Sequence, residues 1–271
     1  MMIPRPLVVL SLVLSSACSA EAVKGVVASL PSANQNFKVF SVEAKASKPV
    51  KALPQGLAVA TSLLLAFNSG FSNGACLGGG LTQGARKQAV SAVTGAWTTS
   101  AVGFASGDMA TFKTNTKCMG SYLGGSLIAG FLNPKPVPFQ LGEKVGLSFL
   151  IGSALMFTAS QMAGKDPTAL TPFLLALVAN GLSNSVTSVH TANLCRTAHF
   201  SGITSDMGTF IGQILGGNNA NLFKLKVFAG LAACFWIGGA VAFQVAQSMA
   251  SSSLMVCAIL YALTALSTML L

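Results

Sequence analysis

Long stretches without a charged residue constrain the fold of this chain more than any other feature. From Gly56 onward, charges occur only at widely spaced points, and the segments between them are apolar. Several segments hold about 20 residues, which is what a helix needs to cross about 30 Å of hydrocarbon. The alternating pattern of a membrane barrel is absent, and an unpaired backbone is too costly in lipid. We therefore predict an all-α, polytopic membrane helix bundle.

Eight such segments can be delimited. They are residues 57–80, 90–107, 119–132, 145–163, 168–194, 200–216, 227–245 and 253–271. The second and sixth segments are polar for their length, which is typical of short, broken or re-entrant helices inside a bundle. Six full spans with two partial ones are therefore an alternative to eight spans. The positive charges in the gaps are only modestly biased to one side, so the orientation stays open.

Composition excludes several classes of protein. Of the 271 residues, 52% are hydrophobic and 8% are charged, whereas a soluble domain carries about 25% charged residues. The net charge of +10 comes from cations spread along the N-terminal tail and between apolar segments. Cations in such places fit attraction to anionic lipid, so we predict a bilayer partner and no nucleic acid. The six cysteines are scattered without a C-x-x-C pair, so they support neither a disulfide framework nor a zinc site. We predict no metal and no cofactor.

The N-terminus predicts targeting rather than fold. Residues 1–20 combine one cation, a short apolar stretch and small residues near Ala20, which is the layout of a secretory signal peptide. Residues 21–55 are basic, rich in Ala and Ser and poor in acids, as in a transit peptide or a disordered tail. The membrane domain would then cover residues 56–271. A plastid membrane and the plasma membrane are equally favoured destinations.

Short patterns recur in the same order in two parts of the chain. Gly70 to Asn73 recurs at Gly181 to Asn184, Val93 to Gly95 at Phe200 to Gly202, and Gly124 with Gly125 at Gly238 with Gly239. Each pair is separated by about 110 residues. We therefore predict two similar halves, about 56–165 and 166–271. An even number of spans per half would give the halves the same orientation, and an odd number would invert them.

Glycines at helical spacing predict close helix packing. Two stripes have glycines four residues apart: Gly70, Gly74 and Gly78, then Gly208, Gly212 and Gly216. Such stripes let two helix backbones approach closely in lipid. Packing within one bundle is favoured over a dimer interface, although a homo-oligomer stays open as an alternative.

The richest polar stretch runs from Arg196 to Asp206. If it is helical, His199 and Asp206 lie on one face about 10 Å apart, seven residues along the helix. Ser201 and Ser205 lie near that face. Ionisable groups within an apolar domain are costly unless they are paired or face water, so they are candidates for function, including a proton-coupled role. The alternative is that Arg196 and His199 lie at the membrane interface and that Asp206 bonds a neighbouring helix.

The corresponding stretch of the first half has hydroxyl groups but no charge. From this stretch, Thr94 is a candidate member of the polar cluster. The amides Asn73 and Asn184, which occupy matching positions in the two halves, are further candidates. An amide in a span commonly bonds another helix, and we favour that role over ligand binding.

These motifs resemble those of the YoaK family, integral membrane proteins classified as a domain of unknown function. The resemblance rests on Gly-x-Ser-Asn followed by Thr-Gly, and on Arg-Thr-x-His-x-x-Gly-x-x-x-Asp-x-Gly beginning at Arg196. It covers roughly residues 56–271. Ala96 replaces the usual asparagine of the first motif, and Ser201 stands where threonine is usual. The resemblance implies a membrane fold with duplicated halves and no established substrate.

Two functions from different classes fit these features. A small-solute or ion transporter is favoured by the duplication, the broken-looking polar segments and the charged cluster. The alternative is a non-transporting scaffold or assembly factor, because no ion or nucleotide motif is recognisable. We do not predict an enzyme, since the chain has no His-rich metal motif and no Gly-x-Ser-x-Gly.

Overall fold

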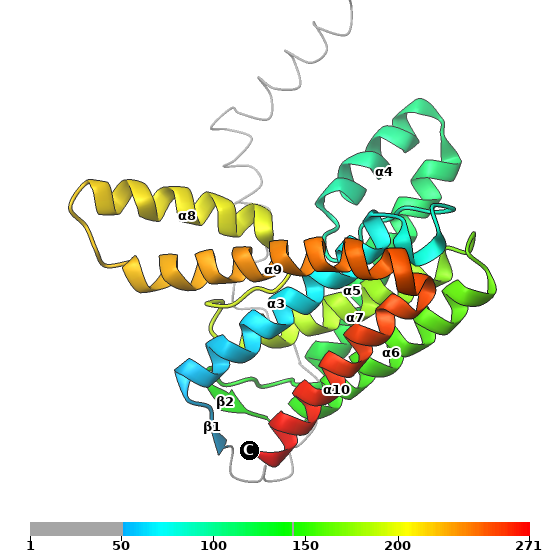
Figure 1. Cartoon of the computed structure of the whole chain (residues 1–271). Helices are drawn as coiled ribbons and strands as arrows, with labels where there is room; N and C mark the ends of the chain where they lie inside the picture. Colours follow the sequence, from blue (N-terminus) through cyan, green and yellow to red (C-terminus); the bar gives the residue numbers. More distant parts are fainter. Residues whose placement is uncertain (1–50, 143) are drawn as a thin grey trace, which may run out of the picture. The chain divides into compact units, whose positions relative to one another are not determined.

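The computed structural model describes residues 51–142 and 144–271, which form a helical unit with one small sheet (Figure 1). In chain order the elements are β1 (Lys51–Ala52), α3 (Gln55–Leu77), the 3-10 helix η1 (Gly80–Thr82), α4 (Thr94–Ser106), α5 (Met109–Leu132), β2 (Gln140–Leu141), α6 (Val145–Lys165), α7 (Thr171–His190), α8 (Phe200–Leu215), α9 (Leu222–Met249), the 3-10 helix η2 (Ala250–Ser253) and α10 (Leu254–Leu270). The predicted helical class is confirmed. The predicted signal peptide at 1–20 and nearly all of the tail at 21–55 lie outside the described residues.

Local signals set where several helices begin and end. α4 ends at Gly107, whose φ of 79° lies in the left-handed region that suits glycine. The Asp108 side chain then caps α5 by accepting the Thr111 backbone N–H at 3.0 Å. Hydrogen bonds from Thr111 also lower the pKa of the Asp108 carboxyl. α5 is therefore longer than the predicted segment 119–132, because Lys113 and Lys117 belong to the helix and not to a loop.

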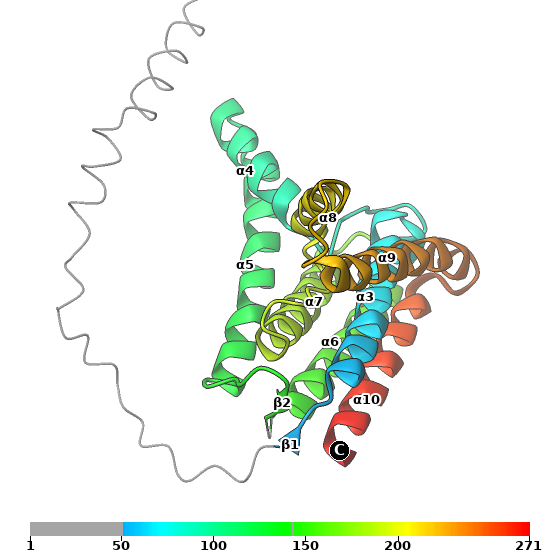
Figure 2. The same ribbon diagram turned by 90° about the vertical axis from the view of Figure 1, so that its left-hand side faces the viewer.

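The long helices pack in pairs with defined directions (Figures 1 and 2). α3 crosses α9, and α5 crosses α7, each pair running parallel. α6 runs antiparallel to α10, as Gly146 meets Met269 while Ser153 bonds Ala258. α3 and α7 are antiparallel as well, since residues 58–65 of α3 and 186–190 of α7 line one cavity. The strands β1 and β2 pair antiparallel beside that cavity, with Ala52 opposite Gln140.

Glycines bring the α3 and α9 backbones into contact. A Cβ added to Gly70 would overlap the carbonyl of Phe235, and one added to Gly74 would lie 2.5 Å from the Gly239 carbonyl oxygen. Gly78 lies against the Phe243 side chain. A side chain larger than hydrogen would therefore separate these two helices.

A matching contact joins α5 and α7. A Cβ at Gly181 would overlap the Tyr122 carbonyl, and one at Gly125 would overlap the Val178 carbonyl. Gly70 and Gly181 are about 110 residues apart, as are Tyr122 and Phe235. The two crossings therefore use corresponding positions of the recurring patterns.

The stripe on α8 does not pack as expected. A Cβ built at Gly208 or Gly212 would have no atom within 4 Å apart from its own stretch of helix. A Cβ at Gly216 would meet only carbonyls of its own helix. In the part of the chain that the structure describes, this stripe therefore does not pack within the bundle, and the alternative of a dimer interface stays a prediction. α8 contacts α9 through another face, on which Ile203 is buried and Phe210 packs near Phe228.

The outer surface of the bundle is apolar. Large side chains on α6, α9 and α10 point outward, including Phe157, Trp236 and Leu263, and Trp236 is 74% exposed. An apolar surface of this extent needs a lipid environment. By length and apolar character, α6, α7 and the stretch from α9 through α10 could each cross a bilayer. The protein is thus membrane-embedded. With 13 and 16 residues, α4 and α8 are shorter than a full span.

Candidate functional site

The stretch with the predicted charged cluster is only partly helical. α8 begins at Phe200, so His199 is its N-cap residue and Arg196 lies in the preceding loop. The premise that His199 and Asp206 share a helix face is therefore wrong. The His199 ring instead lies against Gly202, within 2.5 Å of where a Cβ would stand. Ser201 and Ser205 are exposed.

Arg196 and Asp206 do come together. Nη2 of Arg196 lies 3.8 Å from Oδ2 of Asp206, and the two side chains are 28% and 42% exposed. Nε of Arg196 also donates to the Asn193 carbonyl at 3.4 Å. An ion pair this exposed stabilises by at most about 1 kcal/mol. Its position at a cavity, rather than its stability, makes it a candidate for function.

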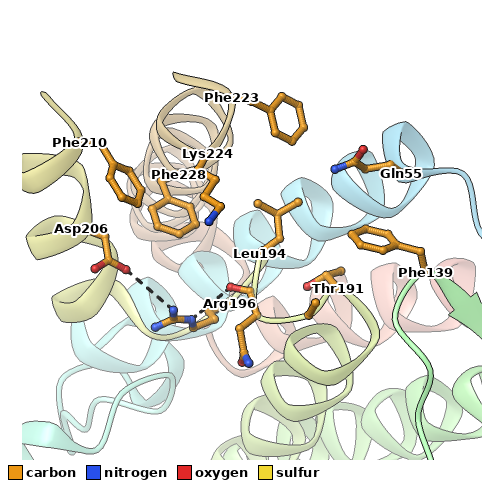
Figure 3. A pocket seen from close by; sticks show the side chains of 12 residues that line it. Gln55, Phe139, Thr191, Leu194, Arg196, Asp206, Phe210, Phe223, Lys224 and Phe228 are labelled. Carbon is orange, nitrogen blue, oxygen red and sulfur yellow. Dashed lines mark hydrogen bonds and ion pairs between the residues drawn. The ribbon is translucent and has the colours of Figure 1, made fainter. Parts of the chain in front are cut away.

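That cavity, here called the terminal cavity, has a volume of about 480 Å³ and lies where α7 ends and α8 and α9 begin (Figure 3). Its lining comprises Gln55, Phe139, Thr191, Ala192, Asn193, Leu194, Arg196, Asp206, Phe210, Phe223, Lys224 and Phe228. Two cations, one carboxylate and four phenyl rings thus surround one space. The volume lies in the range of small-molecule sites, about 300 to 1,000 Å³.

Asn73 and Asn184 have corresponding roles that differ from the predicted one. Oδ1 of Asn73 accepts the backbone N–H groups of Val90 and Ser91 at 2.9 and 3.3 Å. Oδ1 of Asn184 accepts the N–H of Ala198 at 3.0 Å. Both amides therefore bind the loop before the next helix and not another helix. Thr94 is the exposed first residue of α4, far along the chain from the charged pair.

Threonines hold the same two loops. The hydroxyl of Thr82 donates to the Arg86 carbonyl at 2.8 Å and accepts the Arg86 N–H at 3.0 Å. The hydroxyl of Thr191 accepts the Cys195 N–H at 2.9 Å. Sequence reasoning missed both threonines, although their separation of about 110 residues matches the recurring patterns.

A buried group of polar side chains, here called the polar seam, lies where α3, α7 and α10 meet. Its members are Asn68, Ser69, Ser72, Asn180, Ser183 and Tyr261, all at most 3% exposed. The Ser69 hydroxyl donates to Oδ1 of Asn180 at 3.0 Å, and Nδ2 of Asn180 donates to the Ser72 hydroxyl at 3.0 Å. Nδ2 of Asn68 donates to the Cys257 carbonyl of α10 at 3.4 Å. These bonds tie the middle of α3 to α7 and α10.

Three atoms of the polar seam have no hydrogen-bond partner among the described residues. They are Oδ1 of Asn68, the Ser183 hydroxyl and the Tyr261 hydroxyl, and the last two lie near each other without forming a hydrogen bond of 3.5 Å or less. A buried polar group left unpaired costs about 1–3 kcal/mol, so native structures rarely retain three together without a use. The signal in the sequence was the pair of amides at 68 and 180 inside charge-free segments. The recurring motifs indicate Asn73 and Asn184 instead.

His190 is a further buried polar residue that sequence reasoning missed. Its Nδ1 lies 3.0 Å from the Gln140 carbonyl, and its Nε2 has no partner in the described chain. The ring lines a small cavity with Ser62 and Thr187, separate in its lining from the charged pair. In the described residues, no group of three or more His, Cys, Asp or Glu side chains could hold a metal ion.

Comparison with known proteins places the chain in a family. A family model described as "Protein of unknown function (DUF1275)" matches residues 61–267. No curated protein matches the chain, and no solved structure does. The match runs from within α3 to within α10 and includes the polar seam, the lining of the terminal cavity except Gln55, and the motifs that resemble YoaK-type proteins. This chain therefore belongs to the DUF1275 family of proteins of unknown function.

Proposed function

We propose that this membrane protein is a transporter or permease for a small polar solute or an ion. The observation that carries the proposal is the polar seam, with three unpaired oxygen atoms near the middle of the bundle. Polar groups are costly at membrane depth and mark solute pathways when they face a cavity or one another. Groups such as Asn68 Oδ1 and Tyr261 OH would form hydrogen bonds with a solute and so replace part of the water that hydrates it.

We further propose that the membrane domain consists of inverted halves, about 56–165 and 166–271. Support comes from the antiparallel directions of α3 and α7 and from the corresponding glycine contacts at Gly70 and Gly181. The loop bonds of Asn73 and Asn184 add to it. In many transporters, inverted repeats meet at a binding site near the bilayer midplane. In the proposed arrangement, the polar seam joins the first helices of the two halves and would lie near that midplane.

Inversion requires an odd number of crossings in each half. We therefore propose six spans, formed by α3, α5, α6, α7, α9 and α10. α4 and α8 would then be partial segments that pack on α5 and α9. Their shortness supports this assignment over eight spans.

We also propose that residues 1–20 direct the chain into the secretory route, as their layout predicts. A plastid membrane and the plasma membrane remain alternative destinations.

Solute entry into proteoliposomes tests the transport proposal. Vesicles with and without the protein are challenged in turn with glycerol, urea, sodium acetate and sodium phosphate, and swelling is followed by stopped-flow light scattering. A pH-sensitive dye inside the vesicles reports proton movement. We expect one class to enter faster through the protein. Tyr261→Phe and Ser183→Ala should each slow that entry by about threefold to tenfold, as expected for one lost hydrogen bond.

Neither hydroxyl forms a hydrogen bond of 3.5 Å or less in the described chain, and the two lie near each other, so each variant should change thermal stability by less than about 1 kcal/mol. Thr158→Ala is the matched control, because that exposed hydroxyl bonds only its own helix, at the Ala154 carbonyl. If no probe enters faster than in protein-free vesicles, or if Tyr261→Phe transports like the unmodified protein, the proposal is wrong and a scaffold is favoured.

A further inference from the structure

The terminal cavity combines two cationic side chains with a phenyl-rich wall. We propose that it binds a small amphipathic anion, namely a carboxylate or phosphate group attached to an aromatic or short apolar body. The cavity lies among helix ends and shares no residue with the polar seam. The inference therefore concerns a second site, and it does not depend on the proposed transport.

Charge favours an anion in this cavity. Arg196 and Lys224 line it against the single carboxylate of Asp206. Lys224 extends from α9 toward the loop that carries Arg196 (Figure 3). No ion pair involves Lys224 in the described part of the chain. Arg196 uses Nε and Nη2 for its contacts, which leaves further N–H groups of its planar fork for a carboxylate or phosphate.

The aromatic side chains favour an apolar body on the ligand. Phe210 of α8 and Phe228 of α9 have ring centroids 5.8 Å apart and stand beside the charged pair (Figure 3). Phe139 and Phe223 line other parts of the same space. A fully hydrated inorganic ion would gain nothing from these rings, whereas an aromatic or short alkyl group would bury apolar surface against them.

The backbone of the lining is held in an uncommon conformation. Phe139, Ala192 and Asn193 have φ values of 57°, 50° and 62°, in the left-handed region. They are three of the five non-glycine residues with positive φ in the described chain. Such conformations cluster at ligand sites, where the surrounding structure holds them in place. Phe139 is additionally fixed by its N–H, which donates to the His190 carbonyl at 2.8 Å.

Asp206 competes with the proposed ligand for Arg196. Its carboxylate positions the guanidinium at the cavity, yet it is also a negative charge within 3.8 Å of the cation that the ligand needs. Removing this charge should therefore strengthen anion binding, while removing either cation should weaken it. Opposite effects of neighbouring substitutions would not arise from a general loss of structure.

Isothermal titration calorimetry on the full-length protein in phosphatidylcholine nanodiscs tests the inference. The probes are phenyl phosphate, inorganic phosphate, benzyl alcohol and benzylammonium. We expect phenyl phosphate to bind most tightly. Arg196→Gln and Lys224→Gln should each weaken it by about tenfold or more, because each removes a charge-assisted contact. Asp206→Asn should tighten it by a few-fold.

Lys226→Gln is the matched control, since it removes an equal charge two residues along α9 from an exposed position outside the lining. Thermal unfolding of each variant verifies folding. Equal binding of benzylammonium and phenyl phosphate would overturn the inference. So would equal weakening by Lys226→Gln and Lys224→Gln, or an absence of phenyl phosphate binding to folded protein.

A soluble anion and an anionic lipid headgroup share this chemistry, and a second arm separates them. Adding phosphatidylglycerol to the nanodiscs should raise the apparent Kd for phenyl phosphate if the headgroup is the natural occupant. An unchanged Kd identifies a soluble anion. Because binding is measured at equilibrium without a solute gradient, a failure of the transport proposal would leave these results unaffected.

Discussion

At the scale of single residues, two asparagines hold the loops that lead into the short helices. Asn73 and Asn184 each place a side-chain oxygen against backbone N–H groups that no helix satisfies. The sequence identified both residues as important but suggested another helix as their partner. The loop that follows is the better hydrogen-bond partner, because its unpaired N–H groups lie within reach of the helix that carries the asparagine. The interior of another helix has no unpaired N–H group.

Replacing one of these amides should destabilise the protein measurably. Asn184→Ala leaves the Ala198 N–H without its acceptor in a partly buried place, so we expect a loss of about 1–3 kcal/mol. Asn184→Asp retains an acceptor and should lose less. Denaturant unfolding in detergent checks both. Asn218→Ala serves as the control, because that exposed side chain accepts only the nearby Ala220 N–H. Equal stability of Asn184→Ala and the unmodified protein would contradict this role.

At the scale of helices, glycine position matters more than glycine spacing. Gly70 and Gly74 lie against α9, while Gly208 and Gly212 meet nothing in the described chain. A glycine stripe indicates which face of a helix another backbone could approach closely. It does not indicate whether a second helix lies against that face. The recurring Gly124–Gly125 pair was more informative, because Gly125 and Gly238 each lie at a helix crossing, although the sequence pattern aligns Gly125 with Gly239, one residue further on.

Adjacent glycines of α5 should respond very differently to alanine. Gly125→Ala places a methyl group into the Val178 carbonyl, so α5 and α7 must separate, and we expect a loss of about 1–3 kcal/mol or more. Gly124→Ala meets open space and adds helix propensity, so its stability should be unchanged or slightly higher. Thermal unfolding of the two variants under identical conditions makes the comparison. Similar losses in both would show that this crossing is not close in solution.

At the scale of the whole molecule, the apolar runs predicted where the helices lie in the sequence better than which helices pack against each other. The segments 145–163 and 200–216 nearly coincide with α6 and α8. The pairing of α3 with α9 and of α5 with α7 could not be predicted, because the apolar face of one helix can pack against the apolar faces of many other helices. The polar seam was missed for a related reason: Asn68, Asn180 and Tyr261 are isolated in the sequence and become a group only when three helices meet.

The proposed inversion has a consequence that labelling can test. With six spans, the turn at Asp108 and the turn at Asn218 lie on opposite sides of the membrane, because the three crossings α5, α6 and α7 separate them and α8 does not cross. With eight spans, both turns lie on the same side. Single cysteines at these two positions, in a background without the native cysteines, are treated with a membrane-impermeant maleimide on sealed vesicles and again after permeabilisation. We expect one position to react before permeabilisation and both to react afterwards. Reaction of both positions, or of neither, in sealed vesicles would contradict inverted halves and favour eight crossings.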